Sequence, residues 1–168
     1  MALTPSNMLP LGTAAPAFSL PATDGNIVSL EDFHQSPLLL VSFICNHCPY
    51  VIKIAEEFSK LASETQDSVN WIAISANDPD YRAEDSPENM SKFAAKYNFN
   101  FPYLFDGSQE VARTFGAVCT PDIFVYKHSK LAYHARFEDL ARAIKDLQTS
   151  DHISFEDLPS AGCSIKWK

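Results

Sequence analysis

The residues of this chain with the clearest capacity for chemistry are two cysteines, Cys45 and Cys48, in the tetrapeptide Cys45-Asn46-His47-Cys48. The tetrapeptide lies between an apolar run and a segment whose apolar residues recur at helical spacing. A helix N-terminus lowers the pKa of a thiol because its unpaired N–H groups and its dipole favour an anion. Since the thiolate is the reactive form, this placement predicts a pair that closes and reopens a disulfide.

The composition indicates the setting of this chemistry. The chain has 168 residues, a net charge of −8 and four cysteines. It is long enough for one domain with its own core, and its acidic balance argues against nucleic acid or an anionic membrane as a partner. No apolar run approaches the roughly 20 residues that span a bilayer, and the first residues do not read as a secretory signal. We therefore expect a cytoplasmic protein, in which cysteines serve redox or metal chemistry rather than a disulfide scaffold.

The apolar pattern predicts an α/β fold that positions the pair. Residues 17–20 and 27–30 flank the turn signal Asp24-Gly25 and suggest a hairpin. Residues 38–44 and 69–74 read as buried strands, and residues 123–126 and 131–135 as an antiparallel hairpin. Helices are expected from near residue 45, from Ser86-Pro87, from about residue 108 to Gly116, and over residues 137–147. We expect one domain over residues 1–168, with a loose arm over about 1–14 and a strap over about 150–168.

Further motifs accompany the cysteine pair. Thr120-Pro121 comes directly before a predicted strand, and other short motifs lie at residues 15–21, 28–30, 43–50, 77–78, 84–88, 118–122 and 162–168. Together they resemble the peroxiredoxin-like subfamily of thioredoxin-fold proteins, of the AhpC/TSA type with a Cys-x-x-Cys pair. The resemblance covers nearly the whole chain. It implies a thioredoxin-like (glutaredoxin-type) three-layer α/β/α sandwich with a mixed central sheet and an N-terminal β-hairpin.

The resemblance implies a disulfide reductase or a peroxidase. Peroxiredoxins carry Pro-x-x-x-Thr-x-x-Cys and a later arginine that helps to bind the peroxide. If Cys48 matches their peroxidatic cysteine, Cys45 stands at the threonine position and Pro121 where the arginine would be. Those missing groups are hydrogen-bond donors that would stabilise the transition state, so their loss predicts slow peroxide chemistry. A thiol-disulfide oxidoreductase in redox homeostasis is the leading hypothesis, and a thiol-dependent peroxidase that uses Cys48 is the alternative.

For the leading hypothesis, Cys45 is the expected attacking thiolate, because it lies nearest the expected helix start and the N-terminal cysteine is the exposed one in thioredoxin-like exchange. Cys48 would then attack the mixed disulfide and release the product. A protonated His47 would stabilise a thiolate and raise the reduction potential; its alternative role is an exposed polar residue. Pro121 matches the cis-proline of thioredoxins, which implies that the backbone of Thr120 pairs with a bound substrate strand.

Cys119 and Cys163 are possible auxiliary resolving cysteines; as alternatives, Cys119 is a buried apolar residue and Cys163 a surface thiol. A third class of function, a non-catalytic binding module, would use the pair for a structural disulfide or for zinc. Zinc would require Cys45, Cys48 and Cys119 to converge with Cys163 or His47.

The acidic stretch Asp78, Asp80, Glu84 and Asp85 lacks calcium-loop spacing and reads as a solvated loop, and the other histidines receive no role. We expect no cofactor and no metal. The expected partners are protein disulfides or thiols, with peroxides as alternative substrates, and a thiol electron donor.

Overall fold

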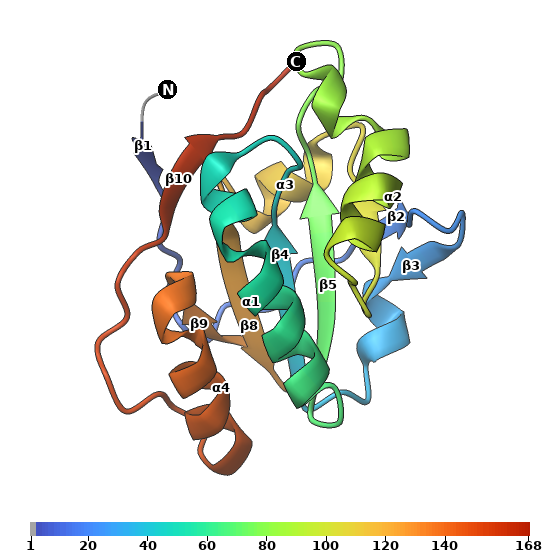
Figure 1. The fold of residues 1–168 in the computed structure, drawn as a ribbon. Coiled ribbons are helices and arrows are strands. Elements are labelled where there is room, and N and C mark those ends of the chain that lie inside the picture. Colours follow the sequence, from blue (N-terminus) through green and yellow to red (C-terminus); the bar gives the residue numbers. More distant parts are fainter. Residues whose placement is uncertain (1–2) are drawn as a thin grey trace.

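A mixed five-stranded sheet forms the centre of the structure, a computed structural model that describes residues 3–168 (Figure 1). The sheet has the strand order β6-β5-β4-β8-β9. Its strands are β4 (Leu38–Phe43), β5 (Val69–Ser75), β6 (Tyr103–Phe105), β8 (Asp122–Lys127) and β9 (Lys130–His134). The helices are α1 (Pro49–Thr65), α2 (Pro87–Lys96), α3 (Glu110–Phe115) and α4 (Leu140–Thr149). The remaining strands are short and lie outside the central sheet: β1 (Leu3–Pro5), β2 (Ser19–Pro21), β3 (Ile27–Ser29), β7 (Cys119–Thr120) and β10 (Ala161–Ser164).

The central strand β4 is buried along its whole length because the sheet is covered on both faces. It runs parallel to β5 and antiparallel to β8. Leu38 and Leu40 pack on one face with residues of α1 and α4, and Val41 and Phe43 pack on the other with residues of α3 and of the N-terminal segment. The three-layer α/β/α sandwich with a mixed sheet and an N-terminal β2–β3 hairpin is thus confirmed.

The start of α1 differs from the expectation and matters for the site. The helix begins at Pro49, and Cys48 is its N-cap, with an extended backbone (φ −68°, ψ 120°). The prediction of a helix start near Cys45 is therefore wrong. The physical reason is Pro49, whose ring disfavours helical geometry at the preceding residue and whose missing N–H suits the first helical position.

Most other elements lie where the sequence predicts them. Ser86 caps α2 by accepting a hydrogen bond from the backbone N–H of Asn89, and α3 ends at Gly116, which has a positive φ of 70°. The late hairpin is formed by β8 and β9. The strand β6 has no counterpart in the sequence prediction, because it is only three residues long and has almost no periodicity to detect.

The two chain ends form a second sheet with the order β1-β10-β7. Figure 1 shows β1 and β10 of this sheet side by side. The expectation of a loose arm is wrong for Leu3–Pro5, which pairs with Ala161–Ser164; Met1 and Ala2 lie outside the described residues. The expected strap contains the strand β10, which pairs on its other side with β7. Since β7 carries Thr120, this small sheet brings the C-terminal segment to the site.

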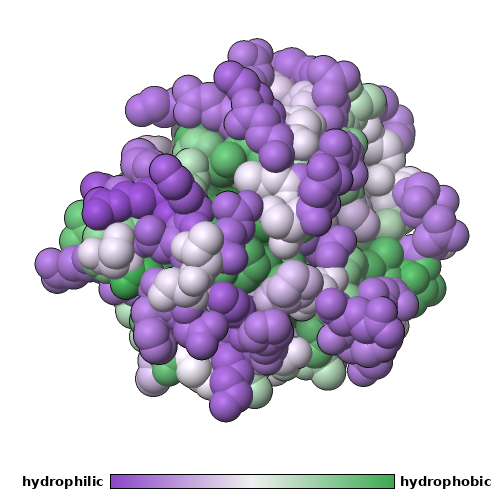
Figure 2. Space-filling model, turned by 90° about the horizontal axis from the view of Figure 1, so that it is seen from below, coloured by the Kyte–Doolittle hydropathy of each residue, from purple (hydrophilic) through white to green (hydrophobic). Residues whose placement is uncertain are grey.

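The end of the molecule at which α1 terminates lies opposite the β1-β10-β7 sheet (Figure 1). Its surface is mostly hydrophilic, with apolar residues in small separate areas (Figure 2). Within residues 3–168, every helix is too short or too polar to cross a bilayer.

Candidate redox site

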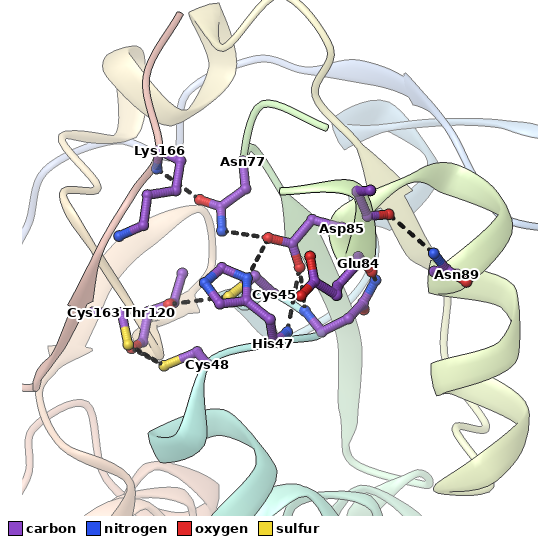
Figure 3. A network of polar contacts seen from close by, with 12 residues as sticks. Cys45, His47, Cys48, Asn77, Glu84, Asp85, Asn89, Thr120, Cys163 and Lys166 are labelled. Atoms are coloured by element: carbon purple, nitrogen blue, oxygen red, sulfur yellow. Dashed lines mark hydrogen bonds and ion pairs between the residues drawn. The ribbon is translucent and has the colours of Figure 1, made fainter. Parts of the chain in front are cut away.

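The cysteine pair lies where β4 leads into α1, at the end of the sheet shown in Figure 3. Cys45 follows β4 and Cys48 caps α1, as the sequence predicts for a strand-to-helix junction. Both side chains are fully buried, with no solvent exposure. The expectation that Cys45 is the exposed cysteine is therefore wrong, because β7 and β10 cover this junction.

The peptide bond between Thr120 and Pro121 is cis, as expected. The hydroxyl of Thr120 lies 3.4 Å from the sulfur of Cys45, and its carbonyl oxygen lies 3.3 Å from the sulfur of Cys48. The backbone of Thr120 is not free for another strand, however, because β10 pairs with β7 and places Cys163 opposite Thr120. The chain itself occupies the edge that the resemblance assigns to a substrate.

The two remaining cysteines differ in their relation to the pair. The sulfur of Cys163 lies 2.9 Å from that of Cys48, and both are buried. The sulfur of Cys119 is directed to the carbonyl oxygen of Pro121, 3.8 Å away. Of the two possible auxiliary cysteines, the structure brings Cys163 into direct contact with Cys48. The alternative of a surface thiol does not hold for Cys163, which is 2% exposed.

The surroundings of the two thiols separate their pKa values. The pKa of Cys48 is lowered to about 4, and the largest cause is a hydrogen bond from the Cys45 thiol. Burial acts in the opposite direction, but contacts with the Cys163 thiol and the backbone N–H of Val51 lower the pKa further. The pKa of Cys45 is raised, because its proton is held in the bond to Cys48, its side chain is buried and the Asp85 carboxylate is near. These directions favour Cys48 as the thiolate, which fits its place at the helix N-terminus.

A buried carboxylate, Asp85, organises the loop between the two cysteines (Figure 3). It accepts hydrogen bonds from the backbone N–H groups of Asn46 and His47, at 2.8 and 3.3 Å. Its other oxygen lies 2.5 Å from Nδ1 of His47 and accepts a bond from the Asn77 amide at 2.8 Å. This carboxylate thus fixes both the backbone and the imidazole beside the pair.

The position of Asp85 corrects two expectations. The sequence predicts a solvated loop for the acidic stretch, but Asp85 is fully buried, because hydrogen bonds from the His47 ring and from backbone N–H groups offset the cost of removing its carboxylate from water. His47 was considered an exposed polar residue as an alternative, but its side chain is only 8% exposed. The sequence carried no signal for the pairing because the two residues come from different segments, 38 positions apart.

The site contains one group of potential metal ligands. Ligand atoms of Cys45, His47 and Asp85 lie within 4.8 Å of one another. This set differs from the four-ligand combination expected for zinc, in which Cys45, Cys48 and Cys119 converge with Cys163 or His47. Asp85 already accepts bonds at both oxygens, so a metal would have to displace its contact with His47.

A second buried pair supports the site from β8 and β9. His134 Nε2 lies 2.8 Å from an oxygen of Asp122, and neither side chain is exposed. Burial raises the pKa of Asp122, against the stabilising effect of His134. Asp122 follows Pro121 directly, so the pair anchors the segment that carries Thr120. The sequence predicts no role for His134, since a single histidine in a strand has no distinctive pattern.

The fold and the protein's relatives define its class: an oxidoreductase with a thioredoxin-like fold. The family model described as AhpC/TSA family matches residues 11–134, so the chain belongs to the AhpC/TSA family. Peroxiredoxin Bcp of Escherichia coli is 34% identical over 110 residues, which are 66% of each chain. The family resemblance inferred from the motifs is thereby confirmed.

Solved structures agree with the fold. A hypothetical protein of Sinorhizobium meliloti, SMc02350, is 38% identical, with a TM-score of 0.95 over 98% of each chain. The thioredoxin domain of a thiol-disulfide oxidoreductase of Bacteroides vulgatus has a TM-score of 0.70 and 23% identity, over 83% of this chain and 98% of that one. The second similarity concerns the fold alone.

Proposed function

We propose that the protein is a thiol-disulfide oxidoreductase that cycles between a Cys45/Cys48 dithiol and its disulfide. The observation that carries the proposal is the convergence of both cysteines on Thr120 at the start of α1: the sulfur of Cys45 lies 3.4 Å from its hydroxyl and that of Cys48, the helix N-cap, 3.3 Å from its carbonyl oxygen. The opposite directions of the two pKa shifts support it, since the thiol with the lowered pKa attacks and the other keeps the proton that the second step has to release. This is the arrangement that a dithiol exchange needs.

In the proposed cycle, Cys48 is the attacking thiolate, a role for which the sequence favoured Cys45. Cys48 attacks one sulfur of a target disulfide, the target S–S bond breaks, and the released thiolate takes up a proton. Cys45 then loses its proton and attacks the sulfur of Cys48, which expels the second target thiol. The target gains two electrons, and the protein ends as the Cys45–Cys48 disulfide, which an external thiol donor reduces again.

Asp85 and His47 are positioning residues in this proposal. Asp85 holds the Asn46–His47 backbone between the two cysteines, and its charge adds to the hydrogen bond with Cys48 and to burial in raising the pKa of Cys45. A cytoplasmic location remains part of the proposal, because thiol donors there would keep the pair reduced.

A trapping experiment tests the assignment of Cys48. Because Cys45 and Cys163 both contact Cys48, the trap is the double variant Cys45→Ser/Cys163→Ser, incubated with a disulfide-bonded peptide. We expect a stable mixed disulfide at Cys48, identified by mass spectrometry, and no peptide reduction. Cys48→Ser should form no adduct. An adduct at Cys45 in Cys48→Ser, with none in the double variant, would overturn the assignment.

Peroxide reduction at Cys48 is the second candidate function. The family membership and the lowered pKa of Cys48 favour it, while the absence of the threonine and arginine donors argues for slow turnover. Peroxide consumption coupled to a thiol donor, compared in wild type and Cys48→Ser, measures this activity. Oxidation of Cys48 to sulfinic acid at high peroxide would support the peroxidase, and metal analysis of the purified protein tests the non-catalytic alternative.

A further inference from the structure

The C-terminal strand β10 pairs with β7, the strand that carries Thr120, and its Cys163 contacts Cys48. Figure 1 shows β10 beside the start of α1. Its Cys163 pairs with Thr120 and its Ser164 with Cys119, and the N–H of Ile165 donates to the carbonyl oxygen of Val118 at 3.0 Å. An extended segment with a cysteine beside Thr120 has the form of a bound substrate strand. Here that segment belongs to the same chain.

The approach of β10 to this edge is built into the sequence by Gly162. A Cβ atom at this position would lie 1.9 Å from the carbonyl oxygen of Thr120, so every larger residue is excluded. The other side of β10 is paired with β1, where Leu3 lies opposite Cys163. The strand is thus held from both sides with Cys163 directed at the site.

The result is a contact between two sulfur atoms from distant parts of the chain. Figure 3 shows Cys163 and Cys48 facing each other, with their sulfur atoms 2.9 Å apart. Cys48 therefore has a thiol neighbour on either side, Cys45 in its own loop and Cys163 in β10. A disulfide from Cys48 to Cys163 needs only a small approach of atoms that already touch.

We propose that Cys163 is a third redox-active cysteine, which takes over the disulfide from Cys45 and links β10 covalently to Cys48. The step rests on the proposed dithiol cycle. The Cys163 thiolate attacks the sulfur of Cys48 in the Cys45–Cys48 disulfide, the old S–S bond breaks, and the Cys48–Cys163 bond forms. Cys45 leaves as a thiolate and takes up the proton that Cys163 released, so no electrons are gained or lost.

Oxidation of the Cys45–Cys48 pair changes one of the interactions that set the pKa of Cys163. Burial and the bond to Cys48 raise the pKa of Cys163 to about 12, and Lys166 acts in the opposite direction. The contribution of Cys48 disappears once its sulfur is held in the disulfide with Cys45. Oxidation of the pair thus removes one of the causes that keep Cys163 protonated.

The exchange has a consequence for substrate access. A Cys48–Cys163 bond fixes β10 on β7 and keeps the backbone of Thr120 closed to another strand. Reduction by a thiol donor leaves β10 held on β7 by strand pairing alone, as in the structure, where all four thiols are free, so that β10 can move away and admit a target disulfide to the buried Cys48. The oxidised protein would then be shielded from further protein disulfides until its donor has acted.

Disulfide mapping of Cys45→Ser tests the proposal. This variant is oxidised with glutathione disulfide and digested under acid conditions, and its peptides are identified by mass spectrometry. In the absence of Cys45 we expect Cys163 to displace glutathione from Cys48, so that most molecules carry the Cys48–Cys163 link. The matched control is Cys45→Ser/Cys119→Ala, which should give the same link because Cys119 does not contact Cys48. Persistence of the Cys48–glutathione adduct without the link would overturn the proposal.

Wild type and Cys163→Ser keep the test independent of the folding of one variant. Oxidised wild type should contain both Cys45–Cys48 and Cys48–Cys163 links, and Cys163→Ser only the first. If wild type forms the Cys45–Cys48 link alone and still reduces the peptide, the inference fails while the proposed function stands. If Cys48 forms no adduct and no link in any variant, both fail.

Discussion

The sulfur atoms of Cys48 and Cys163 lie 2.9 Å apart although 115 positions separate them in the chain. Cys48 owes its place to Pro49, which sets the start of α1, and Cys163 owes its place to the pairing of β10 with β7. Neither local structure alone would bring the two together. The contact thus connects the chemistry of the cysteine loop with the C-terminal strand.

The first prediction concerns the ionisation of Cys48. With a pKa of about 4, the thiolate should persist through neutral and mildly acid pH and disappear near pH 4. Thiolate absorbance at 240 nm, followed against pH, measures this directly. Cys48→Ser should lose the acid transition and Cys119→Ala should keep it. A transition near the ordinary thiol pKa of about 8.5 would contradict the assignment.

The same shift predicts a pH dependence of stability. The pKa of Cys48 is lower in the folded state than in the unfolded one, where it is about 8.5. Its stabilising contribution is therefore complete above that value and is lost as the pH falls toward about 4. The raised pKa values of Cys45 and Cys163 act only above about 8.5, where they favour unfolding. Urea unfolding of reduced wild type and Cys48→Ser between pH 4 and 8 should give a stability difference that shrinks toward pH 4.

A substitution at Gly162 tests whether β10 shields Cys48 from reagents in solution. Gly162→Ala places a Cβ atom where the carbonyl oxygen of Thr120 lies, so β10 should detach from β7. Cys48 should then react faster with iodoacetamide. Ala161→Ser is the matched control, because it adds one atom at an exposed position of the same strand and should leave the rate unchanged. Equal rates in both variants and wild type would show that β10 does not control access.

Asp85 should contribute to stability as well as to the arrangement of the site. Asp85→Asn replaces one acceptor oxygen by an NH2 group that faces donors from His47 and Asn77. We expect a loss of about 1–3 kcal/mol in the free energy of unfolding, measured by urea denaturation. The pKa of Cys45 should fall because the negative charge of Asp85 is gone. Asp67→Asn, at an exposed position, should change neither quantity.

Breaking the buried pair of Asp122 and His134 should lower the free energy of unfolding more than breaking the exposed pair of Glu88 and Lys92. Both side chains are fully buried, so Asp122→Ala leaves the Nε2 atom of His134 without its partner. We expect a destabilisation of about 3–5 kcal/mol, measured by urea denaturation. Glu88→Ala, which breaks the exposed pair with Lys92, should cost far less. A similar loss in both variants would show that burial does not determine the contribution of the pair.

The parts of the fold that the sequence predicted are those with strong local signals. The apolar run of β4, the Ser86-Pro87 start of α2 and the Gly116 end of α3 were each recognisable within a few residues. The short strands β1, β6, β7 and β10 were missed because two to four residues carry little periodicity and pair only with distant partners. Their existence depends on strand pairing rather than on propensity.

The sequence by itself determined that two cysteines lie between a buried strand and an amphipathic helix, because that information is local. The place of Thr120-Pro121 beside them, 72 and 75 positions further on, depends on the packing of the chain. Only the tertiary structure decided which cysteine caps the helix, that both are buried, and that Asp85 and Cys163 complete the site. These properties arise from contacts between segments far apart in the chain. Burial and neighbouring charge set the pKa of a thiol, and neither is fixed until the strands and helices have packed.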